Sequence, residues 1–154
     1  MAAWKMPPIA KVYEALGAIG DGRVKLLDTN RAEVKSSDGA KNYTVLTSDD
    51  CRTIAANDNA SFWQGYLGYP AIAVLIARKV LTAGRNAIDA LRDVAWKELN
   101  KKTRNDYAKT IATIELRMVE RGINPAGIRE ECERVLKSLR ALKPERGERL
   151  APAR

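Results

Sequence analysis

Apolar and polar residues alternate through three short segments between residues 24 and 46. A period of two is typical of strands that bury one face of a sheet. The residues expected on the buried face are Val24, Leu26, Ala32, Val34, Tyr43 and Val45. Turn-forming residues at 29–30 and 37–39 separate the segments, so we predict a small antiparallel β-meander. Residues 52–56 carry a fainter signal for a fourth strand.

Helical periods occupy the rest of the chain. Apolar residues recur three and four positions apart from Ile9 to Ile19, which predicts an N-terminal helix. A short aromatic helix near residue 60, an almost wholly apolar helix from Ala71 to about Leu81 and two further short helices follow. Two amphipathic stripes then flank a Gly-Ile-Asn-Pro junction at 122–125, which predicts an antiparallel helical hairpin. The stripes are Tyr107, Ile111, Ile114 and Met118, then Ile128, Cys132, Val135, Leu139 and Leu142.

The strand signals precede residue 60 and the long helical periods follow it, so the predicted fold class is α+β. We expect an N-terminal helix, the β-meander and a helical C-terminal half that ends in the hairpin. The predicted divisions are an α+β core at 1–103, a hairpin packed on it at 104–142 and a basic tail at 143–154. Residues 145–154 have no apolar stripe, so we expect them to pack little against the domain and to contribute little stability.

The excess of positive charge is confined to two segments of a chain whose net charge is +8. Residues 78–109 carry nine basic and four acidic side chains and residues 137–154 carry six and two, whereas residues 1–77 are balanced. A local positive field attracts polyanions. The predicted nucleic-acid contacts are Lys97, Lys101, Lys102, Arg104, Lys109, Arg140, Lys143, Arg146 and Arg149. An ordinary solvated helix surface, with a Glu98–Lys102 pair, explains the stretch at 97–109 equally well.

The segment from Phe62 to Pro70 holds four aromatic residues and two glycines. Such a composition suits a base-stacking platform or a small-molecule pocket. Aromatic residues at helical spacing more often pack in a core, and that interpretation turns Trp63 inward. Tyr66 and Tyr69 are the candidates for stacking at a surface.

The chain has no histidine, which excludes Ser-His-Asp and Cys-His nucleophile systems and histidine-ligated zinc. No catalytic residue, metal site or cofactor is predicted. The oxygen-rich residues Asp49, Asp50, Asn57, Asp58 and Asn59 lack the spacing of a calcium loop, so we assign them to turns and helix caps.

The spacing of Cys51 and Cys132 matches no metal-binding or redox motif, which favours two buried thiols in a reducing cytoplasm. A disulfide between them is the alternative that the sequence leaves open. The first residues lack the apolar core of a signal peptide. The longest apolar run, Ala71 to Ala77, is too short to span a bilayer. We therefore expect a cytoplasmic protein without a membrane partner.

The segment Asn57-Asp-Asn-Ala-Ser-Phe-Trp-Gln-Gly-Tyr-Leu-Gly-Tyr-Pro70, with Trp96-Lys-Glu-Leu-Asn100, resembles small uncharacterised archaeal conserved proteins. The likeness covers residues 8–110. It implies a cytoplasmic archaeal setting and supplies no activity and no functional residues.

The segregated charge leads to the functional hypothesis of a non-enzymatic RNA-associated protein, carried by a ribosome or another ribonucleoprotein, that binds phosphate backbone through its basic C-terminal half. The alternative is a protein-interaction module that docks on an acidic partner, since the same charges serve both. A small-molecule site or an enzyme at the aromatic-glycine segment ranks last, because no nucleophile–base pair accompanies it.

Overall fold

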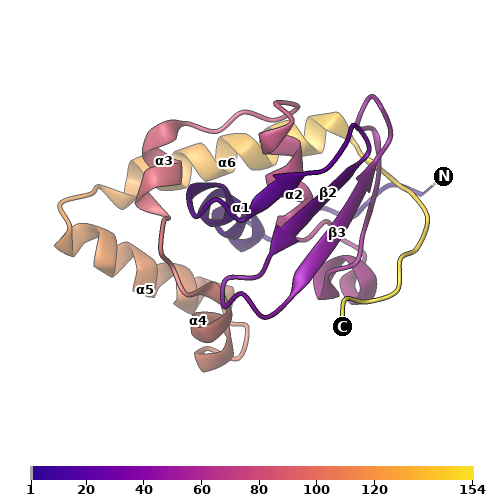
Figure 1. Cartoon of the computed structure of the whole chain (residues 1–154). Helices are drawn as coiled ribbons and strands as arrows, with labels where there is room; N and C mark the ends of the chain where they lie inside the picture. Colours follow the sequence, from indigo (N-terminus) through magenta and orange to yellow (C-terminus); the bar gives the residue numbers. More distant parts are fainter. Residues whose placement is uncertain (1) are drawn as a thin grey trace.

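The computed structural model describes residues 2–154 and consists of one five-stranded sheet covered by helices (Figure 1). Along the chain the elements are α1 (Ala10–Gly20), β1 (Val24–Leu26), β2 (Arg31–Lys35), β3 (Asn42–Thr47), β4 (Thr53–Ala56), η1 (Ala60–Gln64, a π-helix), α2 (Tyr69–Ala77), α3 (Arg85–Ala90), α4 (Trp96–Lys102), α5 (Tyr107–Glu120), α6 (Pro125–Leu142) and β5 (Glu145–Arg146). The predicted α+β class, with an N-terminal helix and a helical C-terminal half that ends in a long helix, is confirmed.

The sheet has the order β1-β2-β3-β4-β5, and its first four strands form an antiparallel meander. The register places Ala32 opposite both Leu26 and Val45, and Val34 opposite both Val24 and Tyr43. The residues expected on one face are therefore direct partners across the strands. β4 gives a faint sequence signal because Ile54, Ala55 and Ala56 are all buried, so the strand does not alternate.

The expectation that residues 145–154 pack little against the domain is wrong. β5 pairs in parallel with β4, the backbone N–H of Gly147 donates to the carbonyl of Ile54 at 2.9 Å, and that of Ala153 donates to Asn57 at 3.1 Å. The Arg146 guanidinium lies 4.7 Å from the centre of the Trp4 ring. Ladder hydrogen bonds and cation–π contacts need no apolar stripe, so the hydrophobic pattern could not reveal this attachment.

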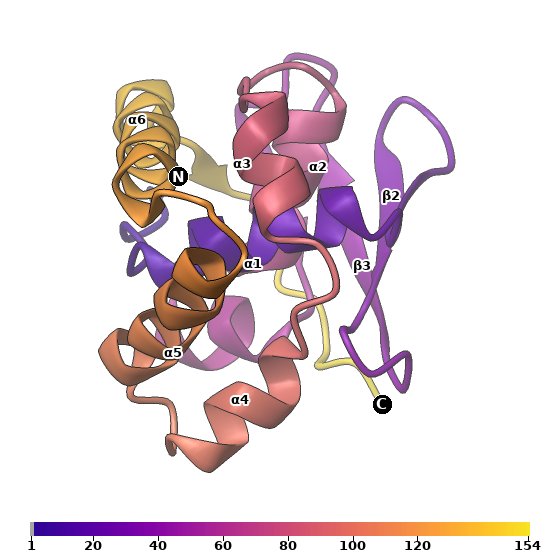
Figure 2. The same cartoon turned by 90° about the vertical axis from the view of Figure 1, so that its left-hand side faces the viewer.

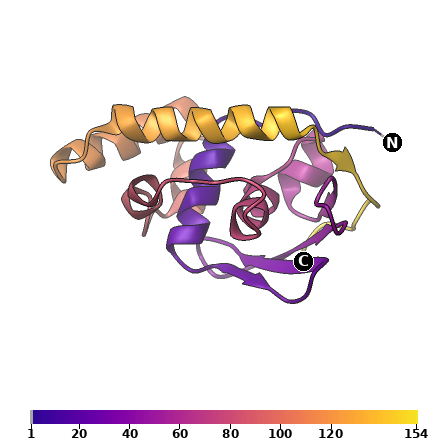
Figure 3. The same cartoon turned by 90° about the horizontal axis from the view of Figure 1, so that it is seen from above.

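The view from above shows three layers, which are the sheet, α1 beside α2, and the C-terminal helix α6 (Figure 3). α2 packs on the sheet, α1 packs on α2, and the C-terminal helices α5 and α6 cover the other side of α1. Every residue of α1 from Ala10 to Ala18 is buried. α2 ends at Ala77 rather than near Leu81, because Lys79 turns into the left-handed region with φ 63°.

The two C-terminal helices follow the sequence signals closely. Gly122 adopts φ +76° after α5, and the Asn124 side chain caps α6 by accepting the N–H of Ala126 at 3.0 Å. α6 then runs back past α1 to the end of the sheet that carries β5 (Figure 1).

α4 is anchored to α1 by a tryptophan that lies against a glycine. A Cβ atom on Gly17 would lie 2.7 Å from Nε1 of Trp96, so the indole packs directly on the α1 backbone. Figure 2 shows α4 below α1 and beside the start of α5. This contact holds the basic helix α4 against one side of α1.

Candidate functional site

A cleft of about 540 Å³ opens between α1, the turn that joins β2 to β3, η1 and α4. It collects polar and aromatic side chains from segments far apart in the sequence. Its lining includes Lys11, Glu14, Tyr43, Asp58, Trp63, Tyr66, Tyr69, Trp96, Lys97, Asn100, Lys101 and Tyr107. Concave sites with aromatic walls and a few convergent polar groups are the usual form of a ligand site.

The floor of the cleft is a buried ion pair on α1. Lys11 Nζ lies 3.0 Å from Glu14 Oε2, and the two residues are only 9% and 3% exposed. Nζ also lies 4.7 Å from the centre of the Tyr107 ring. Burial alone would lower the pKa of Lys11, but the Glu14 carboxylate and the Tyr107 hydroxyl together hold that pKa above its usual value. Lys11 is therefore a fixed cation at the bottom of the cleft.

Asn100 of α4 completes the floor. Its Nδ2 donates to Glu14 Oε1 at 2.5 Å, and its side chain is nine-tenths buried. Because an ionised carboxylate only accepts hydrogen bonds, the amide must point its nitrogen at Glu14. Oδ1 of Asn100 is then buried without a hydrogen-bond partner among residues 2–154.

Asp58 forms a second buried acidic group, between β4 and η1. Its carboxylate accepts the Ser61 hydroxyl at 2.6 Å and the Ser61 N–H at 3.2 Å, and the same hydroxyl accepts the N–H of Gly68 at 3.2 Å. A Cβ atom on Gly68 would lie 1.9 Å from Asp58 Oδ2, so the glycine makes room for the carboxylate. Burial raises the pKa of Asp58 above the ordinary aspartate value, despite these hydrogen bonds.

Trp63 stands at the mouth of the cleft and is 68% exposed, so the interpretation that turned it inward is wrong. Leu67 of the same segment is fully buried and fills the core in its place. Phe62 contacts Trp63 edge to face, with ring centres 4.6 Å apart, and the Arg149 guanidinium lies 4.2 Å from the Phe62 ring. The C-terminal segment thus lies directly behind the aromatic pair.

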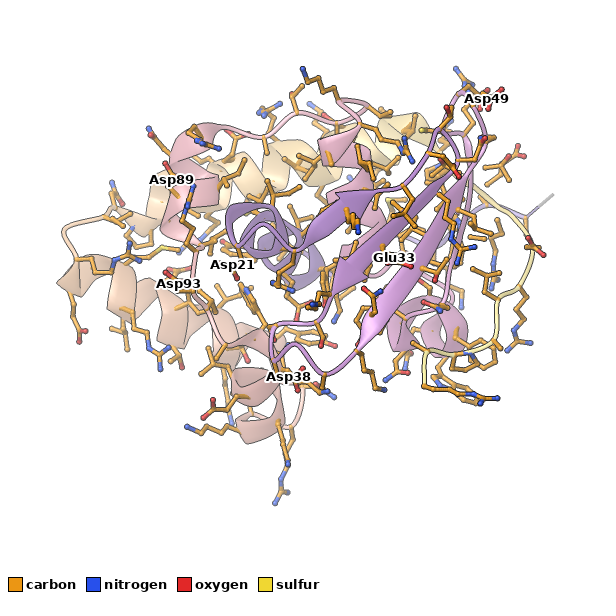
Figure 4. The ribbon with its side chains drawn as sticks, in the orientation of Figure 1. Asp21, Glu33, Asp38, Asp49, Asp89 and Asp93 are labelled. Carbon is orange, nitrogen blue, oxygen red and sulfur yellow. The ribbon has the colours of Figure 1, made fainter. Side chains whose placement is uncertain are left out.

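Two lysines of α4, Lys97 and Lys101, also line the cleft. Lys97 pairs with Asp38 of the β2–β3 turn at 3.1 Å, and Figure 4 shows Asp38 at the end of the sheet next to α4. The N–H of Ala40, the Ser36 hydroxyl and Lys97 all hold the pKa of Asp38 below its usual value. Lys101 has no ion-pair partner in the part of the chain that the structure describes. It is the free cation of the cleft.

The backbone beside this rim is strained. Arg104 and Asn105, which join α4 to α5, both adopt left-handed conformations with φ 53° and 62°. Such conformations are unfavourable for residues with a side chain and cluster at functional sites. Asn105 itself lines the cleft.

Residues 4–145 match the family described as uncharacterised conserved protein UCP014422. The chain belongs to this family. The match includes every residue that lines the cleft, and it extends past residue 110 through α5 and α6. No curated protein and no solved structure matches the chain.

Four of the side chains predicted to contact a ligand come together in the cleft: Lys97, Lys101, Tyr66 and Tyr69. The other predicted contacts do not line it. Lys102 pairs with Glu98 at 3.5 Å, as the helical spacing predicts, and Lys109 lies 3.9 Å from Asp106.

The remaining predicted contacts lie elsewhere. Arg140 and Lys143 are exposed at the end of α6. Arg146 and Arg149 lie over the rings of Trp4 and Phe62.

Sequence reasoning missed the floor of the cleft. Neither Lys11 nor Glu14 was among the predicted site residues, although a signal for their burial exists. They are the only charged residues in α1, whose other members are apolar or glycine apart from Tyr13, so the helix has no polar face to turn to water. Two opposite charges three residues apart on such a helix indicate a buried pair.

A larger hollow of about 710 Å³ lies between α3 and the start of α6. Arg85, Asp89 and Arg121 in its lining are exposed, with Arg85 3.8 Å from Asp89, and the half-buried Glu131 pairs with Arg134. None of its charged side chains is buried, so we place the candidate site in the smaller cleft.

The other sequence predictions concern metals, thiols and membranes. Within residues 2–154 no cluster of three or more metal-ligating side chains occurs, and Asp50 and Asp58 serve a turn and a helix start. Cys51 and Cys132 are buried free thiols, and burial raises the pKa of Cys132. No helix in the described chain combines the length and apolar character that a bilayer crossing requires.

Proposed function

We propose that this protein binds single-stranded RNA without chemical turnover, by admitting a base to the cleft and holding the adjoining phosphates at its basic rim. The supporting observation is that one cleft combines an exposed tryptophan, Trp63, with two rim lysines, Lys97 and Lys101. Base stacking on aromatic side chains and cationic contact with phosphate are the two requirements for binding single strands.

The cleft favours RNA over the alternative of an acidic protein partner. A docking surface for acidic side chains needs cations, but it needs no aromatic-walled cavity with a polar floor. Arg104, in the connection between α4 and α5, is exposed and has no ion-pair partner among residues 2–154, so it adds a positive charge close to the rim lysines in the chain, whereas Lys102 and Lys109 are paired with Glu98 and Asp106. We place the protein in the cytoplasm, bound to a ribonucleoprotein.

The test is fluorescence anisotropy with labelled RNA hexamers over a salt series. We expect binding that weakens as salt rises, and Trp63→Ala should weaken it at least fivefold, since stacking contributes about 1–3 kcal/mol per base. Lys101→Gln should lower the magnitude of the log–log salt slope by about 0.7, the value for one phosphate contact on a single strand.

Lys25→Gln is the matched control, because Lys25 is an exposed lysine on β1, outside the cleft. It should leave both affinity and salt slope unchanged. Absence of RNA binding at low salt, together with a partner that still co-purifies after nuclease treatment, would contradict the proposal and support the acidic-protein alternative.

A further inference from the structure

Helix α5 carries a second apolar stripe on the side that faces away from the domain. Its inner side buries Thr110, Ile114 and Met118. On the opposite side, the residues that recur three and four positions apart are again apolar, and all of them are exposed: Ala108, Ala112, Leu116 and Val119. A surface helix normally turns polar residues to this side. α5 lies at the near surface of the molecule in Figure 2.

The two large side chains of this outer stripe are unusually exposed. Leu116 is 68% exposed and Val119 is 59% exposed. Among the large apolar side chains of residues 2–154, only Trp63 in the cleft is also more than half exposed. Single exposed apolar residues are common, whereas a continuous row of them marks an interaction surface.

We propose that the outer stripe of α5 binds the same stripe of a second copy of this chain, with the two helices antiparallel. This inference does not depend on the proposed function. The stripe is small in its first half, at Ala108 and Ala112, and large in its second half, at Leu116 and Val119.

The sizes of the side chains favour the antiparallel orientation. In that orientation Val119 of each copy lies opposite Ala108 of the other, and Leu116 lies opposite Ala112. Each large side chain then meets a small one, so the helices can approach closely and still fill the space between them. In a parallel pair Leu116 would face Leu116, and the alanines would leave a gap.

The charges beside the stripe favour the same orientation. Lys109 and Glu120 lie on one flank of the stripe, about three helical turns apart. A two-fold axis that crosses the helices brings this flank of each copy together, so Lys109 of one meets Glu120 of the other. Among residues 2–154 Glu120 has no ion-pair partner, and Lys109 has only Asp106 at 3.9 Å. On the other flank Glu115 is already neutralised by Arg129 at 2.6 Å.

Sedimentation velocity of the nuclease-treated protein tests the association. One helix face is a small interface, so we expect a dissociation constant on the order of 10–100 µM and a concentration series from about 1 µM to 1 mM. The protein should be a monomer at the low end and a dimer at the high end. A monomer at every concentration, or growth beyond a dimer, would overturn the inference.

Leu116→Glu tests the stripe. It should raise the dissociation constant about tenfold or more, because each copy loses the burial of one leucine and gains a carboxylate at the contact. Leu27→Glu is the matched control, since Leu27 is an exposed leucine outside α5, and it should dimerise like wild type. A Leu116→Glu protein that dimerises like wild type would overturn the assignment of the surface.

Exchanging the flanking charges tests the orientation. Lys109→Glu and Glu120→Lys should each raise the dissociation constant about fivefold, because either one places like charges together at two symmetry-related positions. Both suit the helix dipole, which favours acids near the start of α5 and bases near its end, so folding is preserved. The double variant Lys109→Glu/Glu120→Lys should return to within about twofold of wild type. A double variant as weak as the single ones would overturn the antiparallel pairing.

Discussion

Removing either member of the Lys11–Glu14 pair should destabilise the protein, and the two losses should respond to pH in opposite directions. Breaking a buried ion pair from one side costs about 3–5 kcal/mol, because the remaining charge is uncompensated. The two side chains are buried deeply enough for this range to apply, at 11% and 4% exposure.

In each single variant, a change in the protonation of the remaining side chain limits the loss of stability. In Lys11→Met the remaining carboxylate can take up a proton, and neutralising an ordinary glutamate with a pKa of ~4.3 costs about 3.7 kcal/mol at pH 7 and about 1.6 kcal/mol at pH 5.5. In Glu14→Gln the remaining ammonium can lose a proton, and for an ordinary lysine with a pKa of ~10.4 this costs about 4.6 kcal/mol at pH 7 and about 2.6 kcal/mol at pH 8.5.

In the wild-type protein Lys11 keeps its charge throughout this range. Because the pKa of Lys11 is raised in the folded protein, its contribution is fully present below the unfolded value and is lost only as pH rises through the folded one. Lys11→Met should therefore recover stability as pH falls, and Glu14→Gln as pH rises.

Urea unfolding followed by circular dichroism at pH 5.5, 7 and 8.5 measures these changes. The double variant Lys11→Met/Glu14→Gln is the control, and it should lie within about 1–2 kcal/mol of wild type, with a difference that is independent of pH. Single variants that each cost less than about 1 kcal/mol at pH 7, or that shift with pH in the same direction, would refute the buried pair.

Three further predictions concern packing, titration and the C-terminal segment. Gly68→Ala places a Cβ 1.9 Å from Asp58 Oδ2 and should cost about 2–3 kcal/mol in urea unfolding. Gly127→Ala in α6, where a Cβ meets open space, should instead raise the free energy of unfolding by about 0.5–1 kcal/mol. Equal effects of the two substitutions would show that the Asp58 side chain moves aside for the new Cβ at position 68. Because burial raises the pKa of Asp58, Asp58→Asn should be at least as stable as wild type at pH 7, with an advantage that shrinks as pH falls toward ~4; an advantage that grows on acidification would contradict this. Ending the chain at Pro144 removes four backbone hydrogen bonds donated by residues 145–153, or about 2 kcal/mol, so the melting temperature should fall by about 4–8 °C, and an unchanged melting curve would mean that the segment is not structural.

Local signals predicted those parts of the fold whose partners are close in the sequence. β2 and β3 alternate strictly, and their turn fixes the register that pairs Ala32 with Val45. The glycine and asparagine between α5 and α6 mark both ends of the turn, because each satisfies a backbone requirement within a few residues.

Distant partners left no such signal. β5 consists of two polar residues, and only pairing with β4, from which every helix except α1 separates it in sequence, makes them a strand. The exposure of Trp63 depends on Leu67, which fills the core in its place, and composition alone cannot choose between the two.

The candidate site was predictable in part. Charge segregation and aromatic content identified its rim, where Lys97, Lys101, Tyr66 and Tyr69 meet. The Asn100 part of its floor could not be read from the sequence, because Asn100 reaches the Lys11–Glu14 pair only when Trp96 brings α4 against Gly17 of α1.

The parallel pairing of β4 with β5 also sets an order of events during synthesis. The edge of β4, Thr53-Ile-Ala-Ala56, leaves the ribosome well before its partner, and the entire helical half of the chain must be made in between. At about 5–20 residues per second, that edge stays open for several seconds. It is uncharged, and an open edge of this kind pairs with other chains. A pause in translation within α6 would lengthen this exposure, so production of the correctly folded protein depends on prompt synthesis of residues 145–147.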